Sequence, residues 1–177
     1  MSKKVVIGVC GGIAAYKMCD VVFGLRRLGV EVEVLMTKTA CSFVGPLTFR
    51  VLSGNDVRIA VVGDGLSHLE ARRDADLLLI APATANMIGK IANGIADDIV
   101  STVAMSFSVD TPRLIAPAMN TDMYNNPAVQ RNLATVASDG YEIIAPRVSL
   151  LACGDEGNGA LANVDTIINT VKEKLSL

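Results

Sequence analysis

Residues 5–12 read VVIGVCGG, a continuous apolar run that is stopped by two glycines. A run that is apolar on both faces predicts a strand buried in a parallel sheet that helices cover on both sides. Residues 14–28 have helical spacing and are followed by Gly29, a residue type that commonly ends helices. The apolar residues that share one face of this helix are Ala15, Cys19, Val22 and Leu25. A strand, a glycine turn and a helix in this order form the first half of a β-α-β unit.

The same alternation of apolar runs and helical segments continues along the chain. The further runs that predict strands are Val30–Met36, Leu77–Ala81, Leu114–Ala116 and Tyr141–Ala145. The further segments with helical spacing are Ala83–Ala92, Ala96–Phe107, Met123–Val136 and Val164–Leu175. Strands that alternate with helices predict an α/β fold with right-handed crossovers. We therefore expect residues 1–177 to form one domain, a single doubly wound (Rossmann-like, flavodoxin-like) parallel sheet with helices on both faces.

The composition of the chain is apolar and nearly neutral in charge. Of its 177 residues, 51% are hydrophobic and 19% are charged, against about 25% charged in an average soluble domain. This low charge is typical of a chain whose surface is partly covered by a partner subunit. The net charge is −2 and there is no basic cluster, which gives no support for binding to nucleic acid or to an anionic membrane. No uncharged apolar run reaches the roughly 18 residues of a membrane span, so we expect a soluble, cytoplasmic protein.

Four cysteines are spread along the chain, at Cys10, Cys19, Cys41 and Cys153. No two of them have the C-x-x-C spacing, and the single histidine leaves no zinc-like cluster, so the sequence predicts no metal site. Free thiols in a reducing compartment fit this pattern better than a disulfide framework does.

The first glycine turn, Gly11-Gly12-Ile13, is placed to bind an anion. Glycines let a ligand approach the backbone, and the N–H groups at the start of a helix favour negative charge. The spacing is not G-x-G-x-x-G, and the second strand ends in Thr37-Lys38-Thr39 rather than in the acidic residue that holds a ribose diol. Hydroxyls and a lysine suit a phosphate, so a mononucleotide such as FMN fits better than NAD. An ordinary tight turn remains the alternative.

Polar side chains also follow two later strands of the predicted sheet. Thr84 and Asn86 come after Leu77–Ala81, and Asn120 comes after Leu114–Ala116. Ligands of open α/β sheets bind at the carboxyl ends of the strands, which is where these residues are expected. Capping a helix is the commoner role for residues such as Thr84 and Asn86, whereas for Asn120 the cap and the ligand are equally compatible with the sequence. Asn120 beside helix N–H groups is therefore either a ligand for a carboxylate or a cap.

Three other residues have side chains suited to chemistry. His68 is the only histidine, and an imidazole titrates near neutrality, although a lone histidine is more often structural or solvent-exposed. Cys153 lies in a glycine-rich polar segment, where a thiol is accessible and can donate a proton or attack an electrophile. Arg73 follows Arg72 close to His68 and could bind an anionic substrate, with a solvated charge pair as the default.

Together these features resemble the flavin-dependent cysteine decarboxylases, from the Gly11 turn to about Ala162. The most specific motifs are PAMNTDM at 117–123 and LACGDEGNG at 151–159. The motifs SHLE at 67–70, IAP at 80–82 and ANGIADD at 92–98 also look like the family. One departure is Tyr124, where the family commonly has tryptophan, and the aromatic ring that it keeps suggests a packing adjustment. The resemblance implies a single FMN-binding decarboxylase domain over residues 1–177.

The resemblance also implies a role for each site residue. The residues that would bind FMN are Gly11, Gly12, Ile13, Thr37, Thr39, Thr84, Ala85, Asn86 and Ala118. His68 would be the base that assists oxidation of the cysteinyl substrate by FMN, and the C=S group so formed accepts the electrons released as CO2 leaves. Cys153 would then protonate the enethiolate product. The residues that would contact the substrate are Asn120 (at its carboxylate), Met123, Arg73 and Ala152.

The partners implied by the resemblance are a small phosphorylated cysteinyl substrate and further copies of the chain. Family members form trimers or multiples of trimers with active sites between subunits, which fits the low charged fraction. Two alternatives remain: decarboxylation of a peptide that ends in cysteine, as in peptide maturation, and a non-catalytic flavoprotein subunit that regulates a partner. Arg73 favours the phosphorylated substrate over a peptide. The presence of His68, Asn120 and Cys153 argues against a non-catalytic role.

Overall fold

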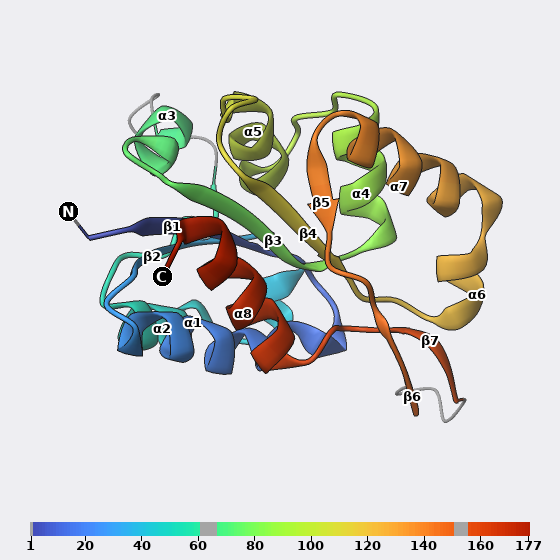
Figure 1. Ribbon diagram of the computed structural model, residues 1–177, viewed down its shortest axis with the longest axis horizontal. Coiled ribbons are helices and arrows are strands. Elements are labelled where there is room, and N and C mark those ends of the chain that lie inside the picture. Colours follow the sequence, from blue (N-terminus) through green and yellow to red (C-terminus); the bar gives the residue numbers. More distant parts are fainter. Residues whose placement is uncertain (1, 61–66, 151–155) are drawn as a thin grey trace.

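The computed structural model describes residues 2–60, 67–150 and 156–177, and a five-stranded parallel sheet lies at its centre (Figure 1). The strand order is β2-β1-β3-β4-β5. The strands are β1 (Lys4–Val9), β2 (Glu31–Met36), β3 (Leu77–Ala83), β4 (Arg113–Pro117) and β5 (Tyr141–Ile143). Each of the five predicted apolar runs is a strand of this sheet, so the predicted α/β fold is confirmed.

Helices cover both faces of the sheet, as the alternating sequence pattern predicts (Figure 1). One face packs against η1 (Ile13–Lys17), α1 (Met18–Arg27), α2 (Pro46–Ser53) and α8 (Val164–Leu175). The other face packs against α3 (Ser67–Arg72), α4 (Ala85–Ala92), α5 (Ile99–Ser106) and α7 (Pro127–Ser138). The short elements η2 (Ala40–Ser42) and α6 (Thr121–Asn125) follow β2 and β4. Within the ranges described, none of the helices combines the length and apolarity that a bilayer crossing requires.

The structure corrects several helix boundaries. The helix predicted over Met123–Val136 is in fact two, because Pro127 occupies the first helical position of α7 and disfavours helical conformation in the residue before it. The helix predicted from Ala14 starts as the 3-10 helix η1, and Ala83 belongs to β3. Helices α2 and α3 were not predicted from the sequence.

A two-stranded hairpin outside the central sheet was also not predicted. It pairs β6 (Arg147–Leu150) with β7 (Glu156–Ala160) in antiparallel fashion and projects beyond the carboxyl end of β4 (Figure 1). The Met119 N–H donates a hydrogen bond to the Gly159 carbonyl at 2.9 Å. Gly159 has φ +135°, and a Cβ there would overlap the Met119 carbonyl oxygen. Only glycine therefore allows the hairpin to dock on the segment that follows β4.

The order in which strands are added to the sheet reverses at β1, since β2 lies on one side of β1 and β3 lies on the other. This order is that of flavodoxin-like folds, in which ligands bind outside the carboxyl ends of the strands at the reversal point. The segments that follow β1, β2 and β3 meet at this edge. The fold thus places the glycine turn, Thr37, Thr39 and Thr84 beside one another.

Candidate active site

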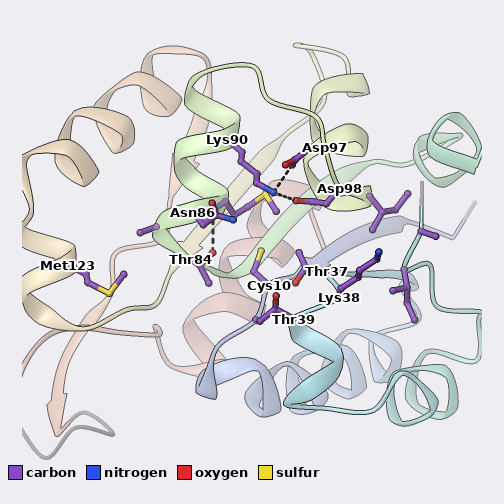
Figure 2. Close-up of a pocket in the computed structure, with 16 residues that line it drawn as sticks. Cys10, Thr37, Lys38, Thr39, Thr84, Asn86, Lys90, Asp97, Asp98 and Met123 are labelled. Atoms are coloured by element: carbon purple, nitrogen blue, oxygen red, sulfur yellow. Dashed lines mark hydrogen bonds and ion pairs between the residues drawn. The ribbon is translucent and has the colours of Figure 1, made fainter. Parts of the chain in front are cut away.

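A cavity of about 790 Å³ lies at the carboxyl ends of β1, β2 and β3 (Figure 2). The segments that follow three strands supply half of its lining. The lining residues from these ends are Cys10 and Gly11 after β1, Thr37, Lys38 and Thr39 after β2, and Thr84, Ala85 and Asn86 after β3. We call this cavity the sheet cavity.

The two glycines of the first turn, which borders the sheet cavity, have different roles. A Cβ on Gly11 would lie 2.5 Å from Thr39 Cγ2 and 2.8 Å from the Thr39 carbonyl carbon, so only glycine lets the β1 and β2 loops approach this closely. A Cβ on Gly12 would meet no atom within 4 Å. The backbone at Gly12 is therefore open to a ligand, as a phosphate-binding turn requires.

The threonines of the sheet cavity also cap local structure. Thr84 Oγ1 accepts a hydrogen bond from Met87 N at 3.2 Å at the start of α4, and Thr37 Oγ1 accepts one from Ala40 N at 3.2 Å. A hydroxyl can accept and donate at the same time. Both residues can therefore cap a turn and still donate to a bound ligand, so capping and ligand binding are compatible here.

An ion-pair cluster that sequence reasoning missed forms the far wall of the sheet cavity. Lys90 Nζ lies 2.5 Å from Asp97 Oδ1 and 2.6 Å from Asp98 Oδ2, and its side chain is only 16% exposed (Figure 2). Burial alone would lower the pKa of Lys90, but the hydrogen bonds to the two carboxylates outweigh burial and raise it. The positive charge thus ties α4 to the residues that begin α5.

Cys10 lies at the base of the sheet cavity and is unsuited to chemistry. Burial raises the pKa of the Cys10 thiol to about 12, which keeps the sulfur neutral near pH 7. The other described cysteines, Cys19 and Cys41, are partly buried and, like Cys10, free. The interpretation of Cys10 as a core residue is confirmed.

A second cavity of about 530 Å³ adjoins the first, and both share Gly11, Thr84, Ala85 and Met123 as lining. Its other walls come from the first turn, the segment after β4 and the β6–β7 hairpin. The lining residues from these walls include Gly12, Ile13, Lys17, Ala118, Asn120, Arg147 and Gly159. We call it the hairpin cavity.

Asn120 sits at the start of α6 in the hairpin cavity. Its Oδ1 accepts hydrogen bonds from Asp122 N at 2.8 Å and from Met123 N at 3.4 Å. The amide is therefore a helix cap, as one of the two interpretations predicted, and its orientation is fixed at the cavity wall. Met123, half exposed, lies one turn further along at the junction of the two cavities.

The structure gathers most of the predicted site residues around these adjoining cavities. Those that line one or both are Gly11, Gly12, Ile13, Thr37, Thr39, Thr84, Ala85, Asn86, Ala118, Asn120 and Met123. Cys153 and Ala152 lie outside the described residues. His68 belongs to α3, and its side chain likewise lies outside what is described.

Arg73 is not brought to either cavity within one chain. Its carbonyl accepts a hydrogen bond from Lys4 Nζ at 3.1 Å, and Lys4 is the first residue of β1. Arg73 therefore lies near the amino end of β1, whereas both cavities lie beyond the carboxyl end. A role for Arg73 at an active site stays a prediction and requires a neighbouring copy of the chain.

The sheet cavity, together with the first turn that separates it from the hairpin cavity, fits FMN. The open backbone at Gly12 accommodates a phosphate, and the end of β2 supplies Thr37, Lys38 and Thr39 with no carboxylate to repel it. The strand order places the cavity at the reversal point where flavodoxin-like folds bind FMN.

The chain belongs to the Flavoprotein family, whose model matches residues 1–176. Its relatives include the probable phosphopantothenoylcysteine decarboxylase of Streptococcus mutans serotype c, 46% identical over 179 residues that cover 99% of this chain and 100% of the relative. The coenzyme A biosynthesis bifunctional protein of Bacillus subtilis is 43% identical over 176 residues, which cover 97% of this chain. The chain spans only 43% of the length of that bifunctional relative.

Solved structures lead to the same family. A PPC decarboxylase variant complexed with pantothenoylaminoethenethiol has a TM-score of 0.88 to this chain at 32% identity, over 100% of both chains. The FMN-dependent cysteine decarboxylase SpaF has a TM-score of 0.84 at 32% identity, over 99% of this chain and 98% of its own. The predicted resemblance to the flavin-dependent cysteine decarboxylases, the doubly wound fold and the FMN cofactor are thereby confirmed.

Proposed function

We propose that the chain is an FMN-dependent carboxy-lyase that converts 4′-phospho-N-pantothenoylcysteine to 4′-phosphopantetheine in coenzyme A biosynthesis. The observation that carries this proposal is the junction of the two cavities. A flavin-sized cavity at the sheet edge opens at Thr84 and Ala85 onto a second cavity in which Asn120 is fixed. The full-length relative from Streptococcus mutans supports the same activity.

The flavin would be held by the segments that follow the first three strands. The turn Gly11, Gly12 and Ile13 would take its phosphate, and the further contacts would come from Thr37, Thr39, Thr84, Ala85, Asn86 and Ala118. A bound FMN would supply reversible two-electron oxidation of the cysteinyl carbon–sulfur unit, which creates a temporary electron sink for loss of CO2.

Asn120 would hold the carboxylate that leaves as CO2. Its amide oxygen is fixed by Asp122 N and Met123 N, so the side chain needs no reorientation when substrate binds. A neutral amide binds a carboxylate without the strong charge stabilisation that would oppose its conversion to neutral CO2. Met123 would contact the substrate at the junction of the cavities.

His68 and Cys153 would carry the proton transfers. An imidazole with a pKa near 6.5 is an efficient base at neutral pH, and His68 is the only one in the sequence. A thiol with a reference pKa of about 8.5 is acidic enough to protonate an enethiolate, which is the role of Cys153 in this proposal. Ala152 beside it would contact the substrate.

The active enzyme would be a trimer or a multiple of trimers in the cytosol. Large apolar side chains are exposed on η1, α1 and α2, and a second copy could cover them. These residues are Ile13, Tyr16, Phe23, Leu47 and Val51. Arg73 lies away from the cavities of its own chain, so a neighbouring copy would have to receive it. The three free cysteines that the structure describes suit a reducing compartment.

A decarboxylation assay with a matched pair of substrates tests the proposal. The holoprotein is mixed with phosphopantothenoylcysteine labelled at the carboxylate, or with a labelled peptide that ends in cysteine. We expect labelled CO2 and 4′-phosphopantetheine from the first substrate only. CO2 from the peptide alone would assign the chain to peptide maturation. No CO2 from either, with FMN bound, would make the chain a non-catalytic flavoprotein.

A further inference from the structure

Two basic side chains from distant parts of the chain line the hairpin cavity. Lys17 is the last residue of η1, and Arg147 is the first residue of β6. They line this cavity together with Gly12, Ile13 and Asn120. The proposed chemistry above assigns no role to either cation, so the positive charge in this cavity needs an explanation.

Arg147 is held in place by its own surroundings. Its Nε donates to the Leu161 carbonyl at 3.2 Å, and its Nη1 donates to Ser149 Oγ at 2.9 Å. These partners are neutral, so they orient the guanidinium without cancelling its charge. A fixed, planar guanidinium is the side chain best suited to bind an oxyanion through two parallel hydrogen bonds.

Neither cation has a carboxylate partner among the side chains that the structure describes. The ion pairs found there involve Lys3, Lys4, Arg50, Arg58, Lys90 and Lys174 instead. Burial and, to a smaller extent, the positive charge of Arg147 lower the pKa of Lys17. Two cations that destabilise each other in one cavity favour the binding of an anion between them.

We propose that Arg147, together with Lys17, binds the phosphate group of the substrate. This inference rests on the proposed function and names the part of the site that recognises the phosphorylated end of the molecule. A phosphomonoester carries close to two negative charges at neutral pH, which matches two cations. Arg147 is then a specificity residue that distinguishes a phosphorylated substrate from a peptide.

The other two anions of the reaction are less suitable occupants. The substrate carboxylate must lose its charge as CO2 forms, and a guanidinium bound to it would stabilise the ground state more than the transition state. The phosphate of FMN is assigned above to the turn Gly11-Gly12-Ile13, which adjoins both cavities and lies next to Thr37, Lys38 and Thr39 at the end of β2. That turn supplies backbone N–H groups of its own for the cofactor, so the two side-chain cations are assigned to the phosphate of the substrate, and retention of FMN in the variants tests this assignment.

Ligand binding to the holoprotein tests this inference without turnover. Calorimetry would measure the Kd of 4′-phosphopantetheine and of pantetheine, which differ only in the phosphate and both lack the carboxylate. We expect wild type to bind the phosphorylated ligand roughly tenfold or more tightly, as loss of a charged hydrogen bond implies. Arg147→Gln and Lys17→Gln should each remove most of this difference, and Arg147→Lys should keep part of it.

The matched control is Arg131→Gln, which removes the same charge from the exposed surface of α7. It should leave both Kd values unchanged. Lys17→Gln removes a charge but leaves the hydrogen bonds of Arg147 to Leu161 and Ser149 intact. An effect of this variant on phosphate binding is therefore due to the lost charge and not to disruption of the hairpin. An equal loss of affinity for both ligands in Arg147→Gln and in Lys17→Gln would overturn the inference. So would a wild type that binds both ligands alike, even if it releases CO2.

Two further measurements distinguish this inference from binding of the FMN phosphate and from the proposed decarboxylation itself. The first is the FMN content of Arg147→Gln and Lys17→Gln, measured as flavin absorbance after gel filtration. Loss of FMN from these variants would show that the two cations bind the phosphate of the cofactor, which would contradict the inference. A wild type that discriminates between the two ligands but releases no CO2 from phosphopantothenoylcysteine supports the phosphate site. The same result contradicts the proposed reaction.

Discussion

The sheet cavity and the hairpin cavity are neighbours that are built in different ways. Half of the residues that line the sheet cavity directly follow β1, β2 and β3, so adjacent strands of one sheet set much of its shape. The hairpin cavity joins the first turn to the β6–β7 hairpin, which lies outside that sheet. In the proposed function, cofactor binding would depend mainly on the central sheet and the first turn, whereas substrate recognition would depend on the β6–β7 hairpin. Changes in the two regions should have separable effects.

The largest separable effect should come from Asn120→Ala in the hairpin cavity. Loss of the amide removes the proposed carboxylate ligand, and we expect CO2 release to fall by about a hundredfold while FMN stays bound. Loss of the cap also destabilises the fold by about 1 kcal/mol. Steady-state assays and flavin absorbance measure both properties.

The control for that variant is Asn126→Ala. Asn126 Oδ1 caps α7 through Ala128 N at 2.9 Å and lines neither cavity. This variant should show the same loss of stability with normal CO2 release. If Asn126→Ala loses as much activity as Asn120→Ala, the effect is due to helix capping and not to substrate binding.

The sheet cavity should respond to Gly11→Ala. The added methyl group would lie 2.5 Å from Thr39 Cγ2, so the β1 and β2 loops must separate. We expect FMN affinity to fall by about tenfold and stability to fall by about 1–3 kcal/mol. Fluorescence titration of the apoprotein with FMN measures the affinity. Gly45→Ala, where a Cβ meets no atom within 4 Å, is the control, and equal FMN affinity in both variants would refute the argument.

Gly159→Ala should affect the hairpin cavity alone. The substitution displaces the hairpin from Met119, and φ +135° adds strain of about 1–3 kcal/mol. We expect KM for the substrate to rise several-fold while FMN affinity stays at the wild-type value. A loss of FMN as large as that in Gly11→Ala would show that the two cavities are not independent.

A smaller effect should come from Lys90→Met at the wall of the sheet cavity. The pKa of Lys90 is raised and that of Asp97 is lowered, so the pair stabilises the fold between the two pKa values. This contribution is lost as the pH falls through the pKa of Asp97 and as it rises through the pKa of Lys90. We expect a melting temperature about 2–4 °C below wild type at pH 7. The difference should shrink as the pH falls through the lowered pKa of Asp97 and as it rises through the raised pKa of Lys90, and a constant difference would contradict the ion-pair explanation.

Much of the sheet cavity could be predicted from the sequence because its parts are local. Each apolar run ends at a recognisable turn, and the parallel order then brings the turns together, which is how Gly11, Thr37 and Thr84 were found. Recognition of the family, the doubly wound fold and the FMN cofactor are confirmed. The roles of His68, Asn120 and Cys153 and the assembly into trimers stay predictions.

The hairpin cavity could not be predicted, because its parts are distant in the sequence and are held together by tertiary contacts. Residues 156–160 read EGNGA, and glycines and polar residues disfavour strands, so contact with Met119 rather than strand propensity holds β7 in place. The approach of Lys17 to Arg147 has no local signal, since 130 residues separate them. Helix α2 did carry a signal, with Pro46 at its start and Gly54 at φ +75° just past its end.

The position of α8 has a consequence for the order in which the chain can fold during synthesis. Ile167 and Val171 of α8 belong to the same core cluster as Val5 and Ile7 of β1. The ribosome makes β1 before α8, its distant covering helix, which follows about 10–30 s later at ordinary elongation rates. One face of the sheet therefore stays incompletely covered until translation has passed residue 175. Completion of the fold is a late event, and nascent chains paused before α8 should be the form most exposed to aggregation and proteolysis.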